Sequence, residues 1–441
     1  MNEMVNKEYR NFSEITSSDY NKVISVAGWV EEVRNLGGIA FIILRQKGGT
    51  LQLAFKKKES EDLFKLATSI TRESVIVAEG IVVANEQARN GYEIFPDKIN
   101  VLSPAETPLP LGVIDKVGAE MDTRFDNRFL DLRKNERHAL FAIRTMILKS
   151  FRESMLKENF IEVHTPKLAG AGAEGGATLF ETDYFGKKAY LSQSPQLYKQ
   201  ILMGTGFDRV FEISPAFRAE PSDTVRHVTE FVSFDGEVAF IKHQEDFLRI
   251  LEKCVVTSID YVKKHGKEHL ESIDIEVKVP SLPIPRLMYT DAVDLLQNEG
   301  KNINEGDDID TESEKILGQM MKEKGHDLYY IRDYPSAIKS FYIMEKDDQR
   351  VYSHSFDMEY KGDEMASGGQ REHRHNRLIE RMKSMKLRPE SFDFYLKAFR
   401  FGMPPHGGWG FGVDRFVQKL IGLSNIREAI LFPRDRNRLV P

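Results

Sequence analysis

The chemistry of this chain is most visible in one short stretch, FRAEPSDTVRHVTEF, at residues 217–231. Two apolar segments flank a polar loop. Charged side chains stand where the segments meet it, with Arg218 and Glu220 on one side and Arg226 and His227 on the other. Two guanidinium groups and an imidazole around one turn, with a phenylalanine just beyond, suit a ligand that is both anionic and flat.

A second candidate site is FDMEYKGDEMASGGQREHRH, residues 356–375. Asp357 and Glu364 could share a Mg²⁺ ion, with a hydroxyl oxygen from Ser367, because Mg²⁺ takes oxygen ligands and leans on one or two carboxylates plus substrate phosphates. Arg371 could hold a carboxylate through two parallel hydrogen bonds. Carboxylates on a β-hairpin are more often solvated surface charges, so both interpretations stay open on these residues alone.

A third candidate is GMPPHGGWGFGVDRF, residues 402–416, in which glycines alternate before Arg415. Glycine weakens a strand interior, so its repetition marks a place where a ligand lies against the backbone. The arginine could lie flat on an aromatic base. The spacing is not that of the dinucleotide fingerprint. A glycine-rich turn with a surface arginine is an equally good interpretation of this segment alone.

Two shorter segments could bind an ammonium or a carboxylate group. GAEGGATLF, residues 172–180, is a glycine-rich loop that carries Glu174 and is suited to a mobile lid. SQSPQLYKQ, residues 192–200, supplies Gln196 and Lys199 near an expected helix start. Taken alone, Lys199 is better explained as an ordinary exposed helix lysine.

These motifs need elements to position them, and the first elements form a barrel. Residues from about 22 to 103 contain Val- and Ile-rich strands separated by Gly-Gly and Asn-Gly pairs, with one short helix over 62–70 after the third strand. Five strands with a helix in that position predict a small closed barrel of the OB type, a common platform for single-stranded nucleic acid.

A proline-rich hinge separates the barrel from the rest. We predict an N-terminal domain over 1–103, a linker over 104–135 and a catalytic domain over 136–441, with a polar insertion at about 265–330. A helix over 136–160 leads into the strand-like FIEVHTP. The strands and helices that follow do not alternate in a regular β-α-β order. The fold class is therefore α+β, with an antiparallel sheet flanked by helices. The acidic segment 295–316 is expected to be a surface insertion without chemistry.

Composition restricts the partners and the compartment. The net charge is −6, from 62 basic and 68 acidic residues, so a nucleic-acid partner must be bound by local patches rather than by bulk charge. Cys254 is the only cysteine, which excludes a disulfide framework and a cysteine-rich zinc site. The first residues, MNEMVNKEYRNFSE, lack the apolar core that is typical of a signal peptide, and the sequence has no run of 18 apolar residues. We expect a soluble cytoplasmic protein that binds no membrane.

Together the motifs resemble a known family. The strand–proline element at 160–166, FRAE–loop–RHxxxF and GxGxGxxR occur in the order of the three signature motifs of class II aminoacyl-tRNA synthetases. EGGA, SPQLYKQ, SGGQREHRH, MPPHGGWG and NIREAILFPRDRNRL are most similar to the aspartyl-tRNA synthetases of the archaeal and eukaryotic type, in subclass IIb. The resemblance covers nearly the whole chain, and it implies that the barrel is the anticodon-binding domain.

The resemblance implies an activity and its ATP site. The enzyme would join L-aspartate to ATP, release pyrophosphate, and transfer aspartate from the adenylate to the 3′ end of tRNA(Asp). Catalytic roles would fall to Arg218 and Arg415. The implied ATP-binding residues are Arg218, Glu220, Arg226, His227, Phe231, Glu364, Gly412 and Arg415, with Phe231 and Arg415 enclosing the adenine. The implied Mg²⁺ ligands are Asp357, Glu364 and Ser367.

The resemblance also implies an aspartate pocket. Its residues would be Glu174, Gln196, Lys199, Asp235, Ser367, Gly368 and Arg371. Arg371 and Lys199 would form a cationic pocket for the second carboxylate, restrained by Asp235, where asparagine-specific relatives tend to carry glutamate. Leaving charged partners unmatched should cost asparagine at least ~1–3 kcal/mol.

In the barrel, Phe41 and Gln52 match positions that stack on and hydrogen-bond an anticodon base, with Arg45 and Glu93 as helpers. From pattern alone, Phe41 is better explained as a core residue. The family also implies a homodimer that forms around Pro166. The resemblance leaves open whether tRNA(Asn) is charged too and what Glu31, Arg89 and Lys339 do.

Three other functions were weighed. An asparaginyl-tRNA synthetase shares most motifs and is the nearest alternative. An asparagine synthetase of this catalytic fold would need no anticodon reader, so the intact barrel argues against it. A non-catalytic RNA-binding paralogue should have lost some of Arg218, Asp357, Glu364 and Arg415, and all four are present.

Overall fold

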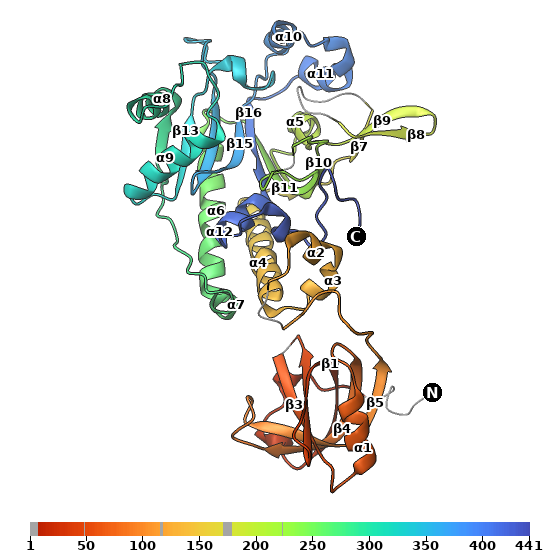
Figure 1. Ribbon diagram of the computed structural model, residues 1–441. Helices are drawn as coiled ribbons and strands as arrows, with labels where there is room; N and C mark the ends of the chain where they lie inside the picture. The colour runs from red at the N-terminus through yellow and green to blue at the C-terminus, as the bar shows by residue number, and fades with distance from the viewer. Residues whose placement is uncertain (1–7, 48, 115–117, 171–178, 223) are drawn as a thin grey trace. The chain divides into compact units, whose positions relative to one another are not determined.

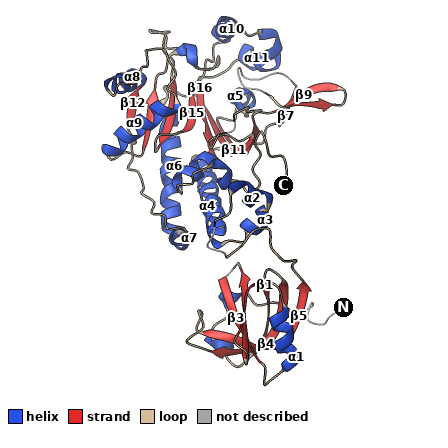
Figure 2. Ribbon diagram, viewed as in Figure 1, coloured by secondary structure: helices blue, strands red, loops and turns tan. Residues whose placement is uncertain are grey.

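The computed structural model describes residues 8–47, 49–114, 118–170, 179–222 and 224–441. They form two compact units, Met1–Thr123 and Arg124–Pro441 (Figure 1). Strands dominate the first unit, whereas the second mixes helices and strands (Figure 2). In the described part of the chain, no helix combines the length and the apolar character needed to cross a membrane.

The first unit is a closed five-stranded barrel with the strand order β1-β2-β3-β5-β4, which confirms the predicted OB fold. Its strands are β1 Val23–Asn35, β2 Ile39–Gln46, β3 Gly49–Lys56, β4 Val75–Ala84 and β5 Tyr92–Ser103. The helix α1, Glu61–Ser69, follows β3 as expected and is capped by Ser60, whose side chain accepts a hydrogen bond from the backbone of Leu63. Two short 3₁₀ turns, η2 Phe12–Glu14 and η3 Ser17–Asp19, precede the barrel.

The barrel core follows from alternation along the strands. On β2, Ala40, Ile42 and Leu44 are fully buried inside the barrel, and the residues between them point the other way. Phe41 is one of these alternate residues. It is half-buried and lies outside the barrel core, so the interpretation of Phe41 as a core residue is wrong.

The second unit is built on an eight-stranded sheet with the order β12-β13-β14-β15-β16-β11-β10-β6. Its strands are β6 Ile161–Glu162, β10 Arg209–Phe217, β11 Glu230–Ala239, β12 Arg286–Met288, β13 Leu328–Arg332, β14 Ser355–Tyr360, β15 Glu364–Gln370 and β16 His406–Gly412. Neighbouring strands from β13 to β10 run antiparallel, and only the two edge pairs are parallel. The predicted α+β class is confirmed.

Helices cover one face of this sheet. Long helices α4, Asn135–Lys157, and α6, Glu245–His265, lie beside the shorter α12, Val413–Leu420 (Figure 1). Their apolar faces meet the sheet in the main core, where Phe151 stacks on Phe234 with ring centroids 4.7 Å apart. This packing fixes the floor from which the site side chains rise on the opposite face.

Smaller elements surround the rest of the sheet. A separate three-stranded sheet contains β7 Leu168–Ala169, β9 Lys187–Leu191 and β8 Glu181–Tyr184. The remaining helices are α5 Gln196–Met203, α7 Lys267–Ser272, α10 His375–Ser384 and α11 Asp393–Arg400, and the 3₁₀ turns are η4 Ser336–Ile338, η5 Pro389–Phe392 and η6 Ile426–Ala429. A second core joins α5, α10 and α11.

The linker was expected to cover residues 104–135, but its last third belongs to the second unit. That part, from Arg124 on, contains the end of α2, Met121–Asp126, and all of α3, Arg128–Asp131. Arg128 is buried and donates to the Asp131 carboxylate at 2.6 Å and to the backbone oxygens of residues 428, 430 and 431. A buried arginine bound in this way ties the segment to the end of the chain.

The region at 265–330 was expected to be an insertion, yet it supplies two strands of the main sheet, β12 and β13. It also contains α8, Tyr289–Asn298, and α9, Thr311–Glu323, which share a core of their own with β13. The polar composition of 295–316 reflects the solvent-facing sides of these helices. The expectation of a purely surface segment is therefore wrong.

Candidate active site

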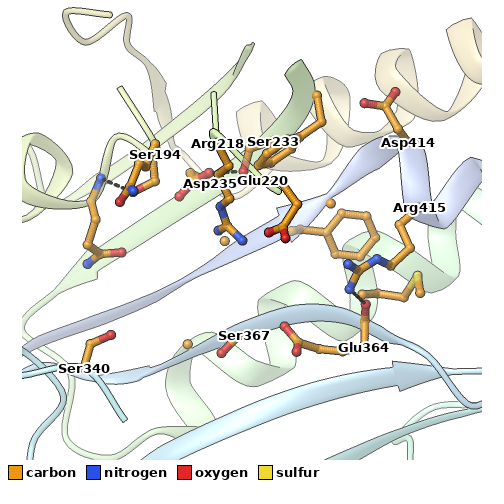
Figure 3. A pocket seen from close by; sticks show the side chains of 18 of the residues that line it. Ser194, Arg218, Glu220, Ser233, Asp235, Ser340, Glu364, Ser367, Asp414 and Arg415 are labelled. Atoms are coloured by element: carbon orange, nitrogen blue, oxygen red, sulfur yellow. Dashed lines mark hydrogen bonds between the residues drawn. The ribbon is translucent and has the colours of Figure 1, made fainter. Parts of the chain in front are cut away.

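The second unit has a cavity of about 420 Å³ on the sheet face opposite the long helices. Its walls come from β11, β15, β16, the 218–228 loop and the start of α12. Glu364 and Ser367 lie on one wall, and Arg218 and Glu220 face them from the other (Figure 3). The residues of the sequence prediction that line it are Gln196, Arg218, Glu220, Arg226, His227, Phe231, Asp235, Glu364, Ser367, Gly368, Arg371, Gly412 and Arg415.

Two predicted residues do not line the cavity, and a third, Glu174, lies outside the described residues. Lys199 is buried behind Asp235, and Asp357 lies on β14, where it pairs across the sheet with Ser367 of β15. The first two can act on a ligand only through, or beside, the residues in front of them.

The glycines of β16 divide into two groups. A Cβ on Gly408 would lie 2.3 Å from a carboxylate oxygen of Glu237, and one on Gly407 would lie 2.4 Å from the Phe247 ring. These two make room for protein side chains, not for a ligand as the sequence suggested. Gly410 and Gly412 line the cavity and keep its floor open.

At one end of the cavity the cations and carboxylates are matched. Lys199 Nζ donates to Asp235 Oδ2 at 2.9 Å and to the backbone oxygen of Trp409 at 2.7 Å. Arg371 donates Nε and Nη2 to the two carboxylate oxygens of Glu237, at 2.8 and 3.2 Å. The sequence prediction that Asp235 restrains both cations is therefore wrong for Arg371, whose partner is Glu237. We call Lys199, Asp235, Glu237 and Arg371 the paired end.

The charge state of Glu237 follows from these contacts. Burial would raise the pKa of the Glu237 carboxyl, but the charges of Arg371 and Lys199 outweigh burial and leave that pKa lowered. Sequence analysis missed Glu237. Its position offered a signal, because it stands two residues after Asp235 on β11 and therefore points to the same face.

A buried histidine supports the paired end. His406 Nδ1 lies 2.8 Å from the backbone oxygen of Pro404, and its Nε2 lies 3.1 Å from Gln200, which accepts a hydrogen bond from Gln196. Burial lowers the pKa of His406 to about 4, so the ring is neutral at pH 7. The ring and Gln200 fix the side chain of Gln196 at the cavity wall.

At the other end the carboxylates crowd together. Asp357 Oδ2 accepts from Lys339 Nζ at 2.7 Å, while its buried Oδ1 has no hydrogen-bond partner in the described part of the chain. Burial, and then repulsion from Asp357, raises the pKa of Glu364. Burial and the neighbouring carboxylates, Glu314 first, raise the pKa of Glu359 well above its ordinary value. Crowded, buried carboxylates favour a bound cation. We call Glu314, Asp357, Glu359 and Glu364 the crowded end.

Three arginines, two from the loop and one from α12, lie near these carboxylates and an aromatic ring. The guanidinium carbon of Arg218 lies 5.3 Å from the centroid of the Phe231 ring, and Arg415 Nη1 donates to the backbone oxygen of Glu364 at 2.8 Å. Arg226 Nη1 donates to Glu314 Oε2 at 3.2 Å. Glu314 belongs to α9, in the region for which no chemistry was expected, and this contact brings it to a residue that lines the cavity.

The loop histidine resembles His406 in that burial is the largest cause of its lowered pKa. His227 Nδ1 lies 2.6 Å from the hydroxyl of Thr224. Burial lowers the pKa of His227, Glu220 opposes this effect, and the nearby arginines reinforce it. An uncharged imidazole can still donate a hydrogen bond to an anionic ligand.

The barrel carries a second set of predicted residues. Arg45 is buried and donates to Glu73 at 2.7 and 3.0 Å, and Gln52 donates to Glu93 at 2.7 Å. Phe41 lies on the same strand and the same face of β2 as Arg45. Glu31 contacts Arg45 at 3.4 Å, and Arg89 is exposed.

Comparisons with known proteins agree with both units. The family model for class II tRNA synthetases (D, K and N) matches residues 120–436, and the model for an OB-fold nucleic acid binding domain matches residues 24–102. The aspartate–tRNA(Asp) ligase of Pyrococcus furiosus is 49% identical over 99% of this chain and 100% of its own length. The aspartate–tRNA(Asp/Asn) ligase of Archaeoglobus fulgidus is 46% identical over 95% of this chain and 96% of its own.

Solved structures share the fold. Asparaginyl-tRNA synthetase from Pyrococcus horikoshii in complex with asparaginyl-adenylate matches with a TM-score of 0.92 at 32% identity, over 98% of this chain and 100% of that one. A putative aspartyl-tRNA synthetase from Leishmania major has a TM-score of 0.89 at 28% identity, over 99% and 97% of the two chains.

Proposed function

The chain belongs to the class II tRNA synthetases of the D, K and N type, and we propose that it is an aspartate–tRNA ligase. It activates L-aspartate with ATP to give aspartyl-adenylate and pyrophosphate, and then transfers aspartate to the 3′ end of tRNA(Asp). The observation that carries the choice of aspartate is the paired end of the cavity, together with full-length likeness to aspartate–tRNA ligases.

The side-chain carboxylate of aspartate is bound by Arg371. Two of its nitrogens are held by Glu237, and the residue lines the cavity. The guanidinium is thus fixed in one orientation before the substrate arrives, which favours a carboxylate over a neutral amide. Lys199, behind Asp235, adds positive charge, and Gln196 with Asp235 faces the α-ammonium group. Ser367 and Gly368 line the same part of the cavity, and Glu174 of the glycine-rich loop would complete it.

Activation needs no side-chain base, because the attacking α-carboxylate is already ionised. One of its oxygens forms a bond to the α-phosphorus of ATP while the bond to pyrophosphate breaks. Arg218 stabilises the negative charge that grows on the α-phosphate, so its contribution is larger in the transition state than in the bound substrates. Phe231 and Arg415 hold the adenine, and Glu220 and Gly412 lie beside them in the cavity wall. Positioning accounts for much of the rate.

The outer phosphates meet the loop cations Arg226 and His227. Facing them, Asp357, Glu364 and Ser367 would hold Mg²⁺. The unpartnered buried oxygen of Asp357 and the raised pKa of Glu364 fit such an ion. Bound there, Mg²⁺ would neutralise charge on the phosphates and on the leaving pyrophosphate. Lys339, which pairs with Asp357, shields this carboxylate at the same wall.

The barrel would read the anticodon through the exposed side of β2 and β3. Phe41 would stack on one base, and Gln52, oriented by Glu93, would hydrogen-bond it. Arg45 is held by Glu73 and so acts on this surface as part of a fixed ion pair. A homodimer would form around Pro166, where Ile161 and Leu168 expose apolar side chains.

An asparaginyl-tRNA synthetase is the second candidate, and the close structural match to the Pyrococcus horikoshii enzyme favours it. Pyrophosphate exchange with aspartate or asparagine separates the two. We expect exchange with aspartate and at least tenfold less with asparagine, since asparagine leaves charged partners unmatched. Exchange that depends on asparagine alone would overturn the proposal.

Charging assays then define the tRNA partner. Purified tRNA(Asp) and tRNA(Asn) are each incubated with radiolabelled aspartate. Aspartate on tRNA(Asp) alone identifies a barrel that reads the whole anticodon. Aspartate on both tRNAs identifies a relaxed reader like the relatives named for tRNA(Asp/Asn), and requires a further enzyme that amidates the aspartate on tRNA(Asn).

A further inference from the structure

Arg226 is bound by two carboxylates that lie outside the family motifs. Its Nη1 donates to Glu314 of α9, and its Nη2 contacts Asp363, which stands in the turn between β14 and β15. Asp363 also contacts Lys419 of α12. The side chains of Arg226 and Glu314 are only 15% and 14% exposed. Both carboxylates therefore hold the guanidinium against the cavity wall with little access to water.

Two glycines place Glu314 at this point. A Cβ on Gly318 of α9 would lie 2.4 Å from the Cα of Gly362, and Gly362 itself has φ +72°, in the left-handed region that favours glycine. The helix therefore rests directly on the β14–β15 turn, backbone against backbone. Glu314 precedes Gly318 by four residues and so lies on the same face of α9, one turn away. The turn that carries Asp363 and the helix that carries Glu314 meet Arg226 as one unit.

The side chain of Arg226 has many rotamers, and ordering it only when ATP binds would reduce affinity. In this structure Arg226 is already held by α9 and the β14–β15 turn. Arg226 lines the cavity beside His227, where it can contact the outer phosphates without leaving its position on the wall. The α8–α9 region thereby becomes part of the ATP site, although it contributes no lining residue.

We propose that Glu314 is a positioning residue, which fixes Arg226 for the outer phosphates of ATP. The proposal rests on the proposed role of Arg226 in ATP binding. A different role would be competition, in which Glu314 occupies Arg226 until ATP displaces it. The two roles predict opposite changes in the KM for ATP when Glu314 is removed.

Aspartate-dependent ATP–pyrophosphate exchange tests the proposal with the full chain. Glu314→Ala should raise the KM for ATP about tenfold, because a free arginine must be ordered on binding, while kcat and the KM for aspartate change less than twofold. Glu314→Gln keeps an oxygen that accepts from Arg226 and should return the KM for ATP to within about threefold of the parent. Glu312→Gln is the matched control, since it lies in the same first turn of α9 with its side chain 76% exposed.

An unchanged or lowered KM for ATP in Glu314→Ala would overturn the proposal, and so would a fall in kcat alone. Gly318→Ala provides an independent check. The added methyl group must push α9 away from the turn, and we expect the same rise in the KM for ATP with Glu314 intact. If the proposed function itself is wrong, the unmodified protein will show no aspartate-dependent exchange. That result is distinct from any change in the KM for ATP.

Discussion

The two ends of the cavity differ in the partners of their buried carboxyl groups. At the paired end, Lys199 and Arg371 each have a carboxylate partner at 2.9 Å or less, and burial has not raised the pKa of Glu237. At the crowded end, Glu359 and Glu364 have raised pKa values, and repulsion between carboxylates contributes to both shifts. At the paired end each carboxylate lies beside a cation, whereas at the crowded end buried carboxyl groups lie close to one another.

This difference matches the two substrates. An amino acid is small and rigidly recognised, so a fixed pair such as Arg371–Glu237 can test for one carboxylate. ATP arrives with several negative charges, and a site with excess carboxylates can accept it only with a cation that both share. On the proposed roles, specificity belongs to the paired end, whereas catalysis requires ATP and the proposed Mg²⁺ at the crowded end.

Removing one carboxylate from the paired end is the strongest test of this comparison. Glu237→Gln leaves Arg371 buried with a neutral partner. Loss of one member of a buried ion pair typically costs about 3–5 kcal/mol of unfolding free energy. We expect a clear fall in the thermal unfolding midpoint of the second unit and a higher KM for aspartate, measured by calorimetry and by pyrophosphate exchange.

Glu230→Gln is the control for this variant, because Glu230 is exposed at the start of the same strand. It should unfold like the parent. If Glu237→Gln also unfolds like the parent, the paired end is not a fixed ion-pair site and the comparison fails.

The next largest effect should come from the loop. Arg218→Ala removes the group that we propose stabilises charge developing on the α-phosphate, and loss of one such donor costs about 10²–10³-fold in rate. We expect pyrophosphate exchange to fall by at least that factor while tRNA binding, measured by filter retention, stays within twofold. Arg249→Ala on α6, whose side chain is 75% exposed, should change neither. Near-normal exchange in Arg218→Ala would contradict the proposed role of Arg218 in activation.

Much of this architecture follows from the sequence. The barrel was predictable because alternation on β2 and Gly-rich turns specify a closed antiparallel sheet with a helix after β3. The candidate ATP residues were found because the loop concentrates two arginines and a histidine within ten residues. Local patterns of this kind need no knowledge of which strands are neighbours.

What the sequence could not predict depends on contacts between distant segments. Glu237 and Arg371 are 134 residues apart, and only the order of β11, β16 and β15 brings them together. Glu314 was assigned to a surface insertion because its segment is polar, and polar composition does not reveal that α9 rests on Gly362. The sequence predicted that the glycines of β16 make room for a ligand, but two of them make room for other parts of the protein.

Removing one carboxylate from the crowded end should have a smaller effect. Asp357→Asn removes one charge from crowded carboxylates, so the thermal midpoint should not fall as it does in Glu237→Gln. The Mg²⁺ concentration for half-maximal exchange should rise about 10–100-fold, which is the usual loss when a metal site loses a supporting group. Asp348→Asn, with an exposed carboxylate, is the control. An unchanged Mg²⁺ requirement would show that Asp357 holds no ion.

The smallest effect extends the comparison to the barrel, whose polar residues are also paired in advance. Gln52 is oriented by Glu93 and Arg45 by Glu73, so Phe41 is the group on this surface that offers mainly stacking. One base stacked on an aromatic ring contributes about 1–3 kcal/mol. Because the paired polar groups remain intact in Phe41→Ala, we expect a loss of binding free energy at the lower end of this range. That loss should raise the KM for tRNA(Asp) about fivefold. Pyrophosphate exchange without tRNA should not change, because Phe41 belongs to the other compact unit.

Phe95→Ala, which removes a half-buried ring from β5 of the same barrel, is the control for general damage to the barrel. If Phe41→Ala leaves the KM for tRNA unchanged, the barrel reads its base through the preset hydrogen bonds alone, and it then resembles the paired end more closely than we infer.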